Sequence, residues 1–208
     1  RGAPQLKVAA IAPTGPDIEI EPNDFLPRSR FSPERLLERL TERVAEVEEP
    51  YCRCLLAALL ADEEMIRRFS HAPGGKTWHH AYIGGLLEHT LSVVAVCRAV
   101  AAYYPQVNVD LLVTGAIFHD LGKTRELSYE TAFDYTTEGR LIGHTTMGCE
   151  FLRHYADQVD GFPRDLLIYL THMILSHHGE TERSPILPMI PEAVLLHYFG
   201  NREAQMGA

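Results

Sequence analysis

The chain has 208 residues, of which 46% are hydrophobic and 23% are charged, so it is long enough for one globular domain with a sizeable core. Its net charge of −9 excludes a surface that attracts polyanions non-specifically, so a nucleic-acid substrate would need a local basic path or bound metal. No apolar run approaches the length of a membrane span and no signal peptide opens the chain, so we expect no membrane contact.

Residues 1–27 do not have the pattern of a domain of their own. Prolines interrupt a weak alternation of apolar residues, which is typical of one or two strands followed by an extended linker. Arg1 is not a start methionine, so we expect that a preceding part of the protein is absent. A disordered arm is the alternative interpretation of this segment.

From residue 28 onward the pattern is helical. Ser32-Pro33-Glu34 supplies a capping hydroxyl, a proline at the first helical position and an acid near the positive end of the helix dipole. Residues 124–140 are polar with scattered aromatics and read as a loop or a small hairpin. Apolar residues at helical spacing predict helices over about 33–47, 50–60, 62–69, 85–104, 109–119, 143–157, 163–178 and 192–205.

The cysteines are Cys52, Cys54, Cys97 and Cys149. The pair Cys52-Arg53-Cys54 could indicate metal or redox chemistry, but its spacing is too short for the usual zinc site and no second pair follows. Because all four lie in apolar helical surroundings, we expect buried free thiols in a reducing cytoplasm.

His119 and Asp120 stand together at the end of an apolar helical run that begins at Leu111. Gly122 follows, and we expect it to cap this helix in a left-handed conformation. A neutral imidazole and a carboxylate are costly to bury without a partner, and a divalent metal is an economical partner for both. The alternative is a core histidine beside an exposed capping aspartate.

Further histidines lie in or at the end of apolar segments that we predict to be helical: His89, His144, His177 and His178. Imidazole and carboxylate donors together suit zinc, manganese, iron or nickel rather than calcium. Histidines that converge from several helices are how helical proteins build metal sites inside a bundle.

Four stretches contain these residues: His79–Thr90, Phe118–Lys123, Tyr135–His144 and Ile174–Glu180. Their order of His, His-Asp, His and His-His resembles that of the HD-domain metal-dependent phosphohydrolases, and specifically the YhaM-type 3′-to-5′ exoribonucleases. The resemblance extends over roughly residues 24–206. It implies an all-α HD-domain helical bundle with a short extended N-terminal segment.

The resemblance also implies a site with two divalent transition-metal ions, which could be manganese, iron, nickel, cobalt or zinc. The first ion would be held by His89, His119 and Asp120. The second would be held by Asp120, His144, His177 and His178. Two such ions can orient a phosphodiester and activate water for its hydrolysis.

Asp120 and Lys123 are the catalytic residues that we expect from this resemblance. Lys123 would also bind a substrate phosphate as a point charge, and His80 would contact the substrate. A solvated lysine at the end of a helix is the alternative interpretation of Lys123. In the resembled family an OB-fold precedes the HD domain, so we expect residues 1–27 to be the remnant of an OB-like module with a linker, and residues 28–208 to be the HD domain.

One position departs from the resembled family. HD domains usually complete the first metal's shell with an aspartate on the last helix, and Gly200 stands at that place here. Asn201 or Glu203 could compensate, only the second metal could bind, or the chain could have little activity. The sequence leaves these alternatives open.

The function that we expect is that of a metal-dependent phosphohydrolase, a 3′-to-5′ phosphodiesterase acting on single-stranded RNA or DNA in the cytoplasm. One alternative is an HD hydrolase of a small nucleotide or a cyclic dinucleotide. Another is a degenerate HD domain that serves as a regulatory binding module. The sequence does not decide whether the chain forms a homo-oligomer.

Overall fold

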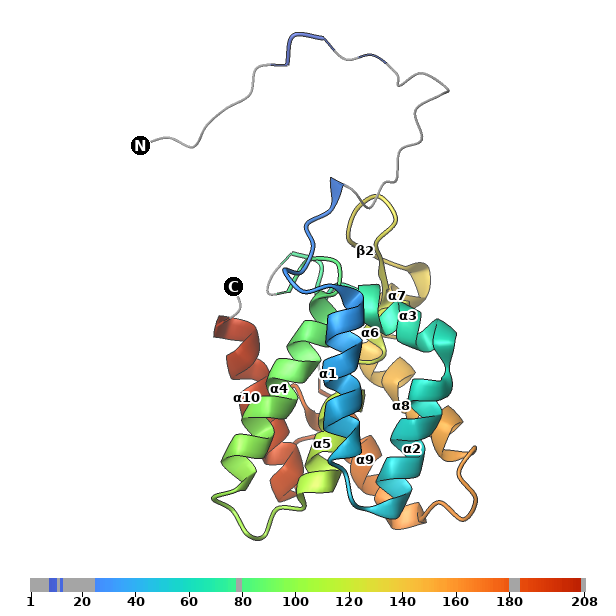
Figure 1. The fold of residues 1–208 in the computed structure, drawn as a ribbon, viewed down its shortest axis with the longest axis vertical. Helices are drawn as coiled ribbons and strands as arrows, with labels where there is room; N and C mark the ends of the chain where they lie inside the picture. The colour runs from blue at the N-terminus through green and yellow to red at the C-terminus, as the bar shows by residue number, and fades with distance from the viewer. Residues whose placement is uncertain (1–7, 11, 13–24, 78–79, 180–183, 207–208) are drawn as a thin grey trace.

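The computed structural model describes residues 8–10, 12, 25–77, 80–179 and 184–206, and the side chains of this range up to residue 201. Most of the segment predicted as an OB-like remnant therefore lies outside the described residues, as does His79. The described part of the chain is a bundle of helices with one very small sheet (Figure 1). The predicted all-α fold is confirmed.

The helices lie at or close to the predicted positions, and the stretch predicted as a loop or hairpin contains two short helices and a two-stranded antiparallel hairpin. In chain order the elements are α1 (Pro33–Ala45), α2 (Pro50–Ala61), α3 (Glu63–His71), α4 (Gly85–Ala101), α5 (Val109–Phe118), α6 (Lys123–Glu126), β1 (Leu127–Ser128), β2 (Asp134–Tyr135), α7 (Thr137–Leu141), α8 (His144–Ala156), α9 (Arg164–Ser176) and α10 (Pro191–Met206).

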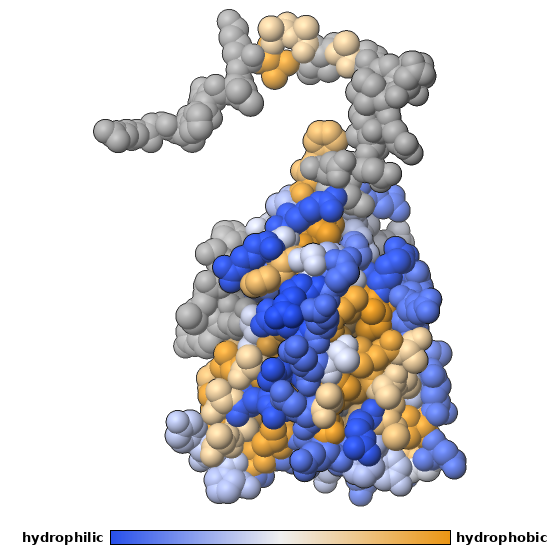
Figure 2. All heavy atoms as spheres, viewed as in Figure 1, coloured by the Kyte–Doolittle hydropathy of each residue, from blue (hydrophilic) through white to orange (hydrophobic). Residues whose placement is uncertain are grey.

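Helix α1 shows how the sequence pattern becomes a packed element. The Ser32 hydroxyl accepts a hydrogen bond from the Arg35 N–H at 3.3 Å, as the capping signal predicts. Leu36, Leu40 and Val44 are buried along one face of the helix. Hydrophilic residues run down the middle of the molecular face that α1 covers, with apolar residues on either side (Figure 2). The helix is therefore fixed to the bundle by its apolar stripe.

Helix α5 is the central element of the bundle. Every residue from Leu111 to Phe118 is buried, so this helix has no polar face to present to water. It packs against α4, α9 and α10, and its last turn leads directly into His119. None of the described helices has both the length and the apolar character needed to cross a membrane.

The cysteine prediction is partly wrong. All four thiols are free, and burial raises the pKa of Cys52 and of Cys97 to about 12. Cys54, however, is exposed, and Cys149 is only half-buried. Because Cys54 follows Cys52 by two positions on α2, the helical rotation turns it to the opposite, outer face.

Asp62 connects two parts of the bundle. Its Oδ1 accepts the Met65 N–H at 3.0 Å and so caps α3, while its Oδ2 accepts the buried Tyr155 hydroxyl at 2.8 Å. We expect Asp62→Ala to lower the free energy of unfolding by about 2 kcal/mol, because it removes the cap and leaves the Tyr155 hydroxyl without its partner. Denaturant unfolding of the two proteins at neutral pH measures this difference.

The matched control is Asp62→Asn, whose amide oxygen can still accept the Met65 N–H and whose NH2 group can instead donate to the Tyr155 hydroxyl oxygen. The Met65 N–H, with help from the Tyr155 hydroxyl, holds the pKa of Asp62 below its usual value. A lowered pKa means that the ionised form stabilises the fold above the ordinary aspartate pKa, and that this stabilisation is lost as the pH falls through the lowered value. Equal stability of Asp62→Ala and the wild type would contradict this role.

Candidate metal site

The six metal-ligating residues predicted from the sequence converge on one cavity, which Leu127 and Tyr135 of the hairpin also line. They come from the start of α4, the residues after α5, the start of α8 and the residues after α9. The residues are His89, His119, Asp120, His144, His177 and His178.

The Asp120 carboxylate lies between two histidine pairs. Its Oδ2 is 3.5 Å from His89 Nε2 and 3.3 Å from His119 Nε2. Its Oδ1 is 3.5 Å from His144 Nε2 and also 3.5 Å from His177 Nε2. One carboxylate therefore faces a different histidine pair with each oxygen, which is the arrangement of a bridging ligand.

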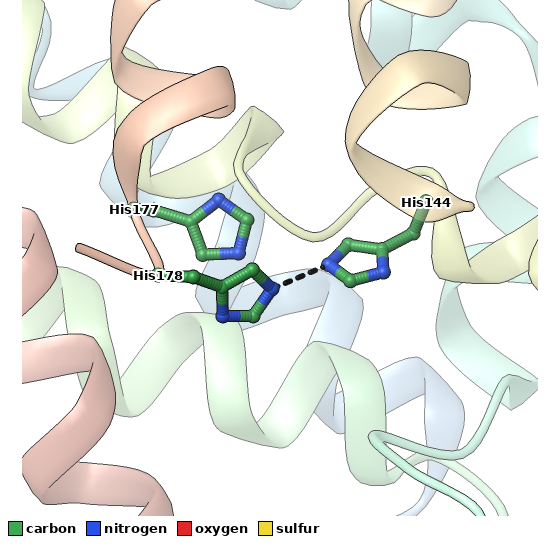
Figure 3. Close-up of side chains that lie close together, drawn as sticks. All are labelled: His144, His177 and His178. Atoms are coloured by element: carbon green, nitrogen blue, oxygen red, sulfur yellow. Dashed lines mark hydrogen bonds between the residues drawn. The ribbon is translucent and has the colours of Figure 1, made fainter. Parts of the chain in front are cut away.

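Two groups of donors have the size of a metal site. The ligand atoms of His144, His177 and His178 lie within 4.8 Å of one another, and so do those of His89, His119 and Asp120. We call His89, His119 and Asp120 the first donor group, and His144, His177 and His178 the second. Figure 3 shows the second group: two histidines at the end of α9 face His144 at the start of α8. His144 Nε2 and His178 Nε2 are 3.0 Å apart, so these two nitrogens point at the same small volume.

Main-chain carbonyls fix the orientation of two of these rings. His119 Nδ1 donates to the Ala116 carbonyl at 2.7 Å, and His177 Nδ1 donates to the Ile174 carbonyl at the same distance. Because a carbonyl oxygen can only accept, Nδ1 carries the proton in both rings. In the neutral rings the Nε2 lone pairs therefore face Asp120, as metal coordination requires.

Glu126 is a site residue that the sequence analysis missed. It is buried, and its Oε1 accepts both the backbone N–H and the Nδ1–H of His144 at 3.0 Å. Burial alone would raise the pKa of the Glu126 carboxyl, but the hydrogen bonds from His144 outweigh it and lower the pKa. A carboxylate on the second nitrogen of a histidine is typical of metal ligands. No sequence signal marks Glu126, because its partner is 18 residues away.

The charge state of the site suits a cation. Burial lowers the pKa of His177 to about 4, and burial together with the neighbouring histidines lowers that of His178 to about 2, so both rings are neutral near pH 7. Burial would raise the pKa of Asp120, but Lys123 and His119 hold it well below its usual value. The site thus offers the neutral imidazoles of His177 and His178 beside one carboxylate.

Two buried polar atoms at the centre of the site have no hydrogen-bond partner among the described residues: Asp120 Oδ1 and His177 Nε2. Buried polar atoms are nearly always paired, so such a pair of acceptors calls for an explanation. A divalent cation would satisfy both the carboxylate oxygen and the imidazole lone pair. The donor set therefore fits the metal that the sequence predicts.

Lys123 is in direct contact with this centre. Its Nζ donates to Asp120 Oδ2 at 2.7 Å and to the Gly74 carbonyl at 2.8 Å. The lysine side chain is 17% exposed, so it is not the solvated residue of the alternative interpretation. Its ammonium links the turn that carries Asp120 to the loop around Gly74.

The predicted left-handed cap at Gly122 is wrong. Gly122 has φ −57° and ψ −23°, which is right-handed helical geometry open to any residue. The reason for a glycine is contact: a Cβ here would lie 2.0 Å from the His144 carbonyl oxygen and 2.9 Å from the Gly148 nitrogen. Two backbone segments of the site therefore touch at Gly122.

The site opens into a cavity of about 1130 Å³, which Lys123 and His80 also line. His80 is the one non-glycine residue with a positive φ, 54°, among those that the structure describes. Its Nδ1 is 2.6 Å from the Tyr82 hydroxyl, and its ring centroid is 5.4 Å from that of His89. His80 is thus held beside the first donor group, on the cavity wall.

Gly200 and Asn201 line the same cavity. A Cβ at Gly200 would meet no heavy atom within 4 Å, so the position is open toward its surroundings. The Asn201 amide lies 3.0 Å from His197 Nδ1, and this ring nitrogen also lies 2.9 Å from the His177 carbonyl. Asn201 therefore contacts His197, which in turn contacts the main chain of His177. The Glu203 side chain lies outside the described residues.

Comparison with known proteins gives a family match and a set of relatives. Relatives of the chain include the 3′-5′ exoribonuclease YhaM of Bacillus subtilis (strain 168) and that of Bacillus velezensis, each 35% identical over 207 residues. The corresponding protein of Oceanobacillus iheyensis is 36% identical over 209 residues. These alignments cover 99% of the chain but only 64–65% of each relative, so the chain spans just under two thirds of their length.

No solved structure matches the chain. The family model described as HD domain matches residues 86–203, which is more than half of the chain. The matched range contains all six converging donors, from His89 to His178. The chain belongs to the HD domain family.

Proposed function

We propose that this chain is a divalent-metal-dependent phosphodiesterase that removes nucleotides from the 3′ end of single-stranded RNA or DNA. The observation that carries the proposal is the Asp120 carboxylate, which lies between two histidine groups in an open cavity. The similarity to proteins named 3′-5′ exoribonuclease supports the substrate class and the direction of cleavage.

The proposed cofactor is a pair of divalent transition-metal ions, of manganese, iron, nickel, cobalt or zinc. Imidazole and carboxylate donors favour these metals over calcium and magnesium. One ion would be held by His89, His119 and Asp120. The other would be held by Asp120, His144, His177 and His178. When bound, they would supply a Lewis acid for the phosphodiester and lower the pKa of water.

The protein's own groups would bind and orient the substrate. The Lys123 ammonium lies at the cavity wall beside Asp120, where it can offset the charge of a phosphate that enters. His80 lies on the same wall, where it would contact the substrate. We further propose that residues 28–208 form the HD domain and that residues 1–27 are the end of an OB-like module.

The experiment that tests this function combines metal content with product analysis. Elemental analysis of protein purified without chelator measures the ions per chain, and we expect two. A 5′-labelled oligonucleotide should shorten stepwise to a ladder of products, whereas an oligomer with a blocked 3′ end should stay intact. Hydrolysis of mononucleotides or cyclic dinucleotides, with oligomers left intact, would contradict the exonuclease assignment.

Gly200 makes a binding module the second candidate function. Neither Gly200 nor Asn201, which both line the cavity, supplies a carboxylate to the first donor group. Protein that takes up no metal even when manganese is supplied, and cleaves no phosphodiester, would favour this candidate. Uptake of one ion would locate the deficit at the first group.

Metal affinity tests whether Glu126 positions the His144 ring. We expect Glu126→Ala to weaken metal binding about tenfold to a hundredfold, because the His144 ring loses the carboxylate that fixes its tautomer and direction. Glu126→Gln, which keeps one acceptor, should lose less. Titration with manganese or zinc measures the affinity.

The control for Glu126 is Glu150→Ala, which removes an exposed carboxylate that pairs with Arg125 and touches no histidine of the site. This variant should bind metal as the wild type does. If Glu126→Ala also binds metal with unchanged affinity, Glu126 has no positioning role.

A further inference from the structure

The rim of the cavity carries an aromatic residue with two cations next to its ring. Tyr135 ends the short strand β2 and is 40% exposed. Lys76 Nζ lies 5.9 Å from the centroid of the Tyr135 ring, and the Arg140 guanidinium carbon lies 5.8 Å from it. All three residues line the cavity that contains the candidate metal site. We refer to Lys76, Tyr135 and Arg140 together as the rim triad.

The rim triad has an excess of positive charge. Lys76 Nζ and Arg140 Nη2 both donate to Asp134 Oδ1 at 2.8 Å, so one carboxylate is shared by two cations. An ammonium has three N–H donors and a guanidinium has five, and Asp134 takes one from each. The side chains of Lys76 and Arg140 are 38% and 58% exposed. This local charge contrasts with the net charge of −9 of the whole chain.

The rim triad is attached firmly to the site. Tyr135 pairs with the buried Leu127 in the hairpin, and the Thr136 N–H donates to the Glu126 carbonyl at 2.9 Å. A Cβ at Gly139 would lie 2.2 Å from the Glu126 carbonyl oxygen, so α7 packs directly on α6. Glu126 in turn holds His144. The hairpin and α7 are therefore a preorganised part of the cavity wall.

We propose that the rim triad is a nucleotide-binding subsite, in which the Tyr135 ring stacks on a base of single-stranded nucleic acid and Lys76 and Arg140 bind the adjacent phosphates. An exposed aromatic ring flanked by cations is how proteins hold single strands without reading their sequence. This inference rests on the proposed function and extends it, because it assigns substrate binding to residues outside the candidate metal site.

The first test is direct binding. A labelled single-stranded oligomer of about ten nucleotides with phosphorothioate linkages, which resists hydrolysis, reports binding by fluorescence anisotropy. We expect Tyr135→Ala to weaken binding about tenfold, and Tyr135→Phe to bind as the wild type does, because the ring is kept. The matched control is Tyr103→Ala, an exposed tyrosine just after the far end of α4, whose loss should change nothing.

The salt dependence of oligonucleotide binding tests the phosphate contacts of Lys76 and Arg140. Each phosphate contact to a single strand contributes a slope of about −0.7 to the dependence of log affinity on log salt concentration. Arg140→Gln and Lys76→Gln should therefore each make this slope shallower by about 0.7. A merely structural role of these residues would lower affinity without changing the slope.

Kinetics separate this inference from the proposed function. With an oligonucleotide substrate, Tyr135→Ala should raise KM about tenfold. With methyl p-nitrophenyl phosphate, a phosphodiester without a base, the wild type and Tyr135→Ala should give equal rates. Unchanged oligonucleotide affinity in Tyr135→Ala would overturn the subsite while the exonuclease assignment stands. A wild type that cleaves no oligonucleotide would overturn the assignment, and the anisotropy comparison would still decide the subsite.

Discussion

Replacing Asp120 by asparagine should reduce phosphodiesterase activity by about a thousandfold and remove most of the bound metal. Asparagine keeps the size of the side chain but has no negative charge, and only one of its two terminal atoms can accept. In the wild type each carboxylate oxygen faces a different histidine pair, at 3.3–3.5 Å. A loss of about 4 kcal/mol in transition-state stabilisation corresponds to this thousandfold effect.

The measurements for Asp120→Asn are metal content after dialysis and the rate of cleavage of a small phosphodiester. Asp157→Asn is the control, because this exposed aspartate follows α8 and is not among the donor groups. It should keep both metal and activity. If Asp120→Asn retained two ions per chain at wild-type activity, the carboxylate would not be a shared ligand and the proposed site would be wrong.

The second large effect is expected at Gly122. A Cβ at this position would lie 2.0 Å from the His144 carbonyl oxygen, 2.8 Å from its carbonyl carbon and 2.9 Å from the Gly148 nitrogen. All three atoms belong to the backbone, so no side chain can rotate away to make room. We expect Gly122→Ala to lower the free energy of unfolding by about 3 kcal/mol and to weaken metal binding, since α8 must move with His144.

Gly200→Ala is the matched control for Gly122→Ala, because both replace a glycine with right-handed helical geometry by alanine. A Cβ at Gly200 meets no heavy atom within 4 Å, and Gly200 lies within α10. Alanine there should stabilise the protein by about 0.5–1 kcal/mol. Denaturant unfolding and metal titration compare the two variants. Equal stability of Gly122→Ala and the wild type would show that the backbone contact is not tight.

The sequence is sufficient to predict the helical bundle, and the six donors that it singles out lie together in the structure. Apolar periodicity and the Ser32-Pro33-Glu34 signal depend on neighbours within one helix, so they predict α1 and the other helices correctly. His119 and His177 stand at the ends of strongly apolar segments, where a polar residue needs a partner. The resemblance to the HD-domain family then predicts that these distant segments contribute to one site.

The errors and omissions concern contacts between segments. Gly122 was expected to serve local backbone geometry, yet its role is to let α8 approach, and no local pattern contains that information. Glu126 and Tyr135 were missed as site residues for the same reason, because their roles depend on His144 and on the cavity. The prediction that Cys54 is buried is wrong because the segment of α2 is apolar as a whole, which does not show which of its faces is exposed.

The hydrogen bonds of His119 and His177 have a consequence for how such a site can persist as a sequence changes. Each ring donates to the carbonyl three residues before it, and that carbonyl belongs to the last turn of the preceding helix, where carbonyls have no helical partner. Each histidine thus terminates its helix and aims its other nitrogen in one step. The direction of these two rings depends on no side chain elsewhere for that hydrogen bond, so the surrounding sequence is free to drift while the two nitrogens keep their direction.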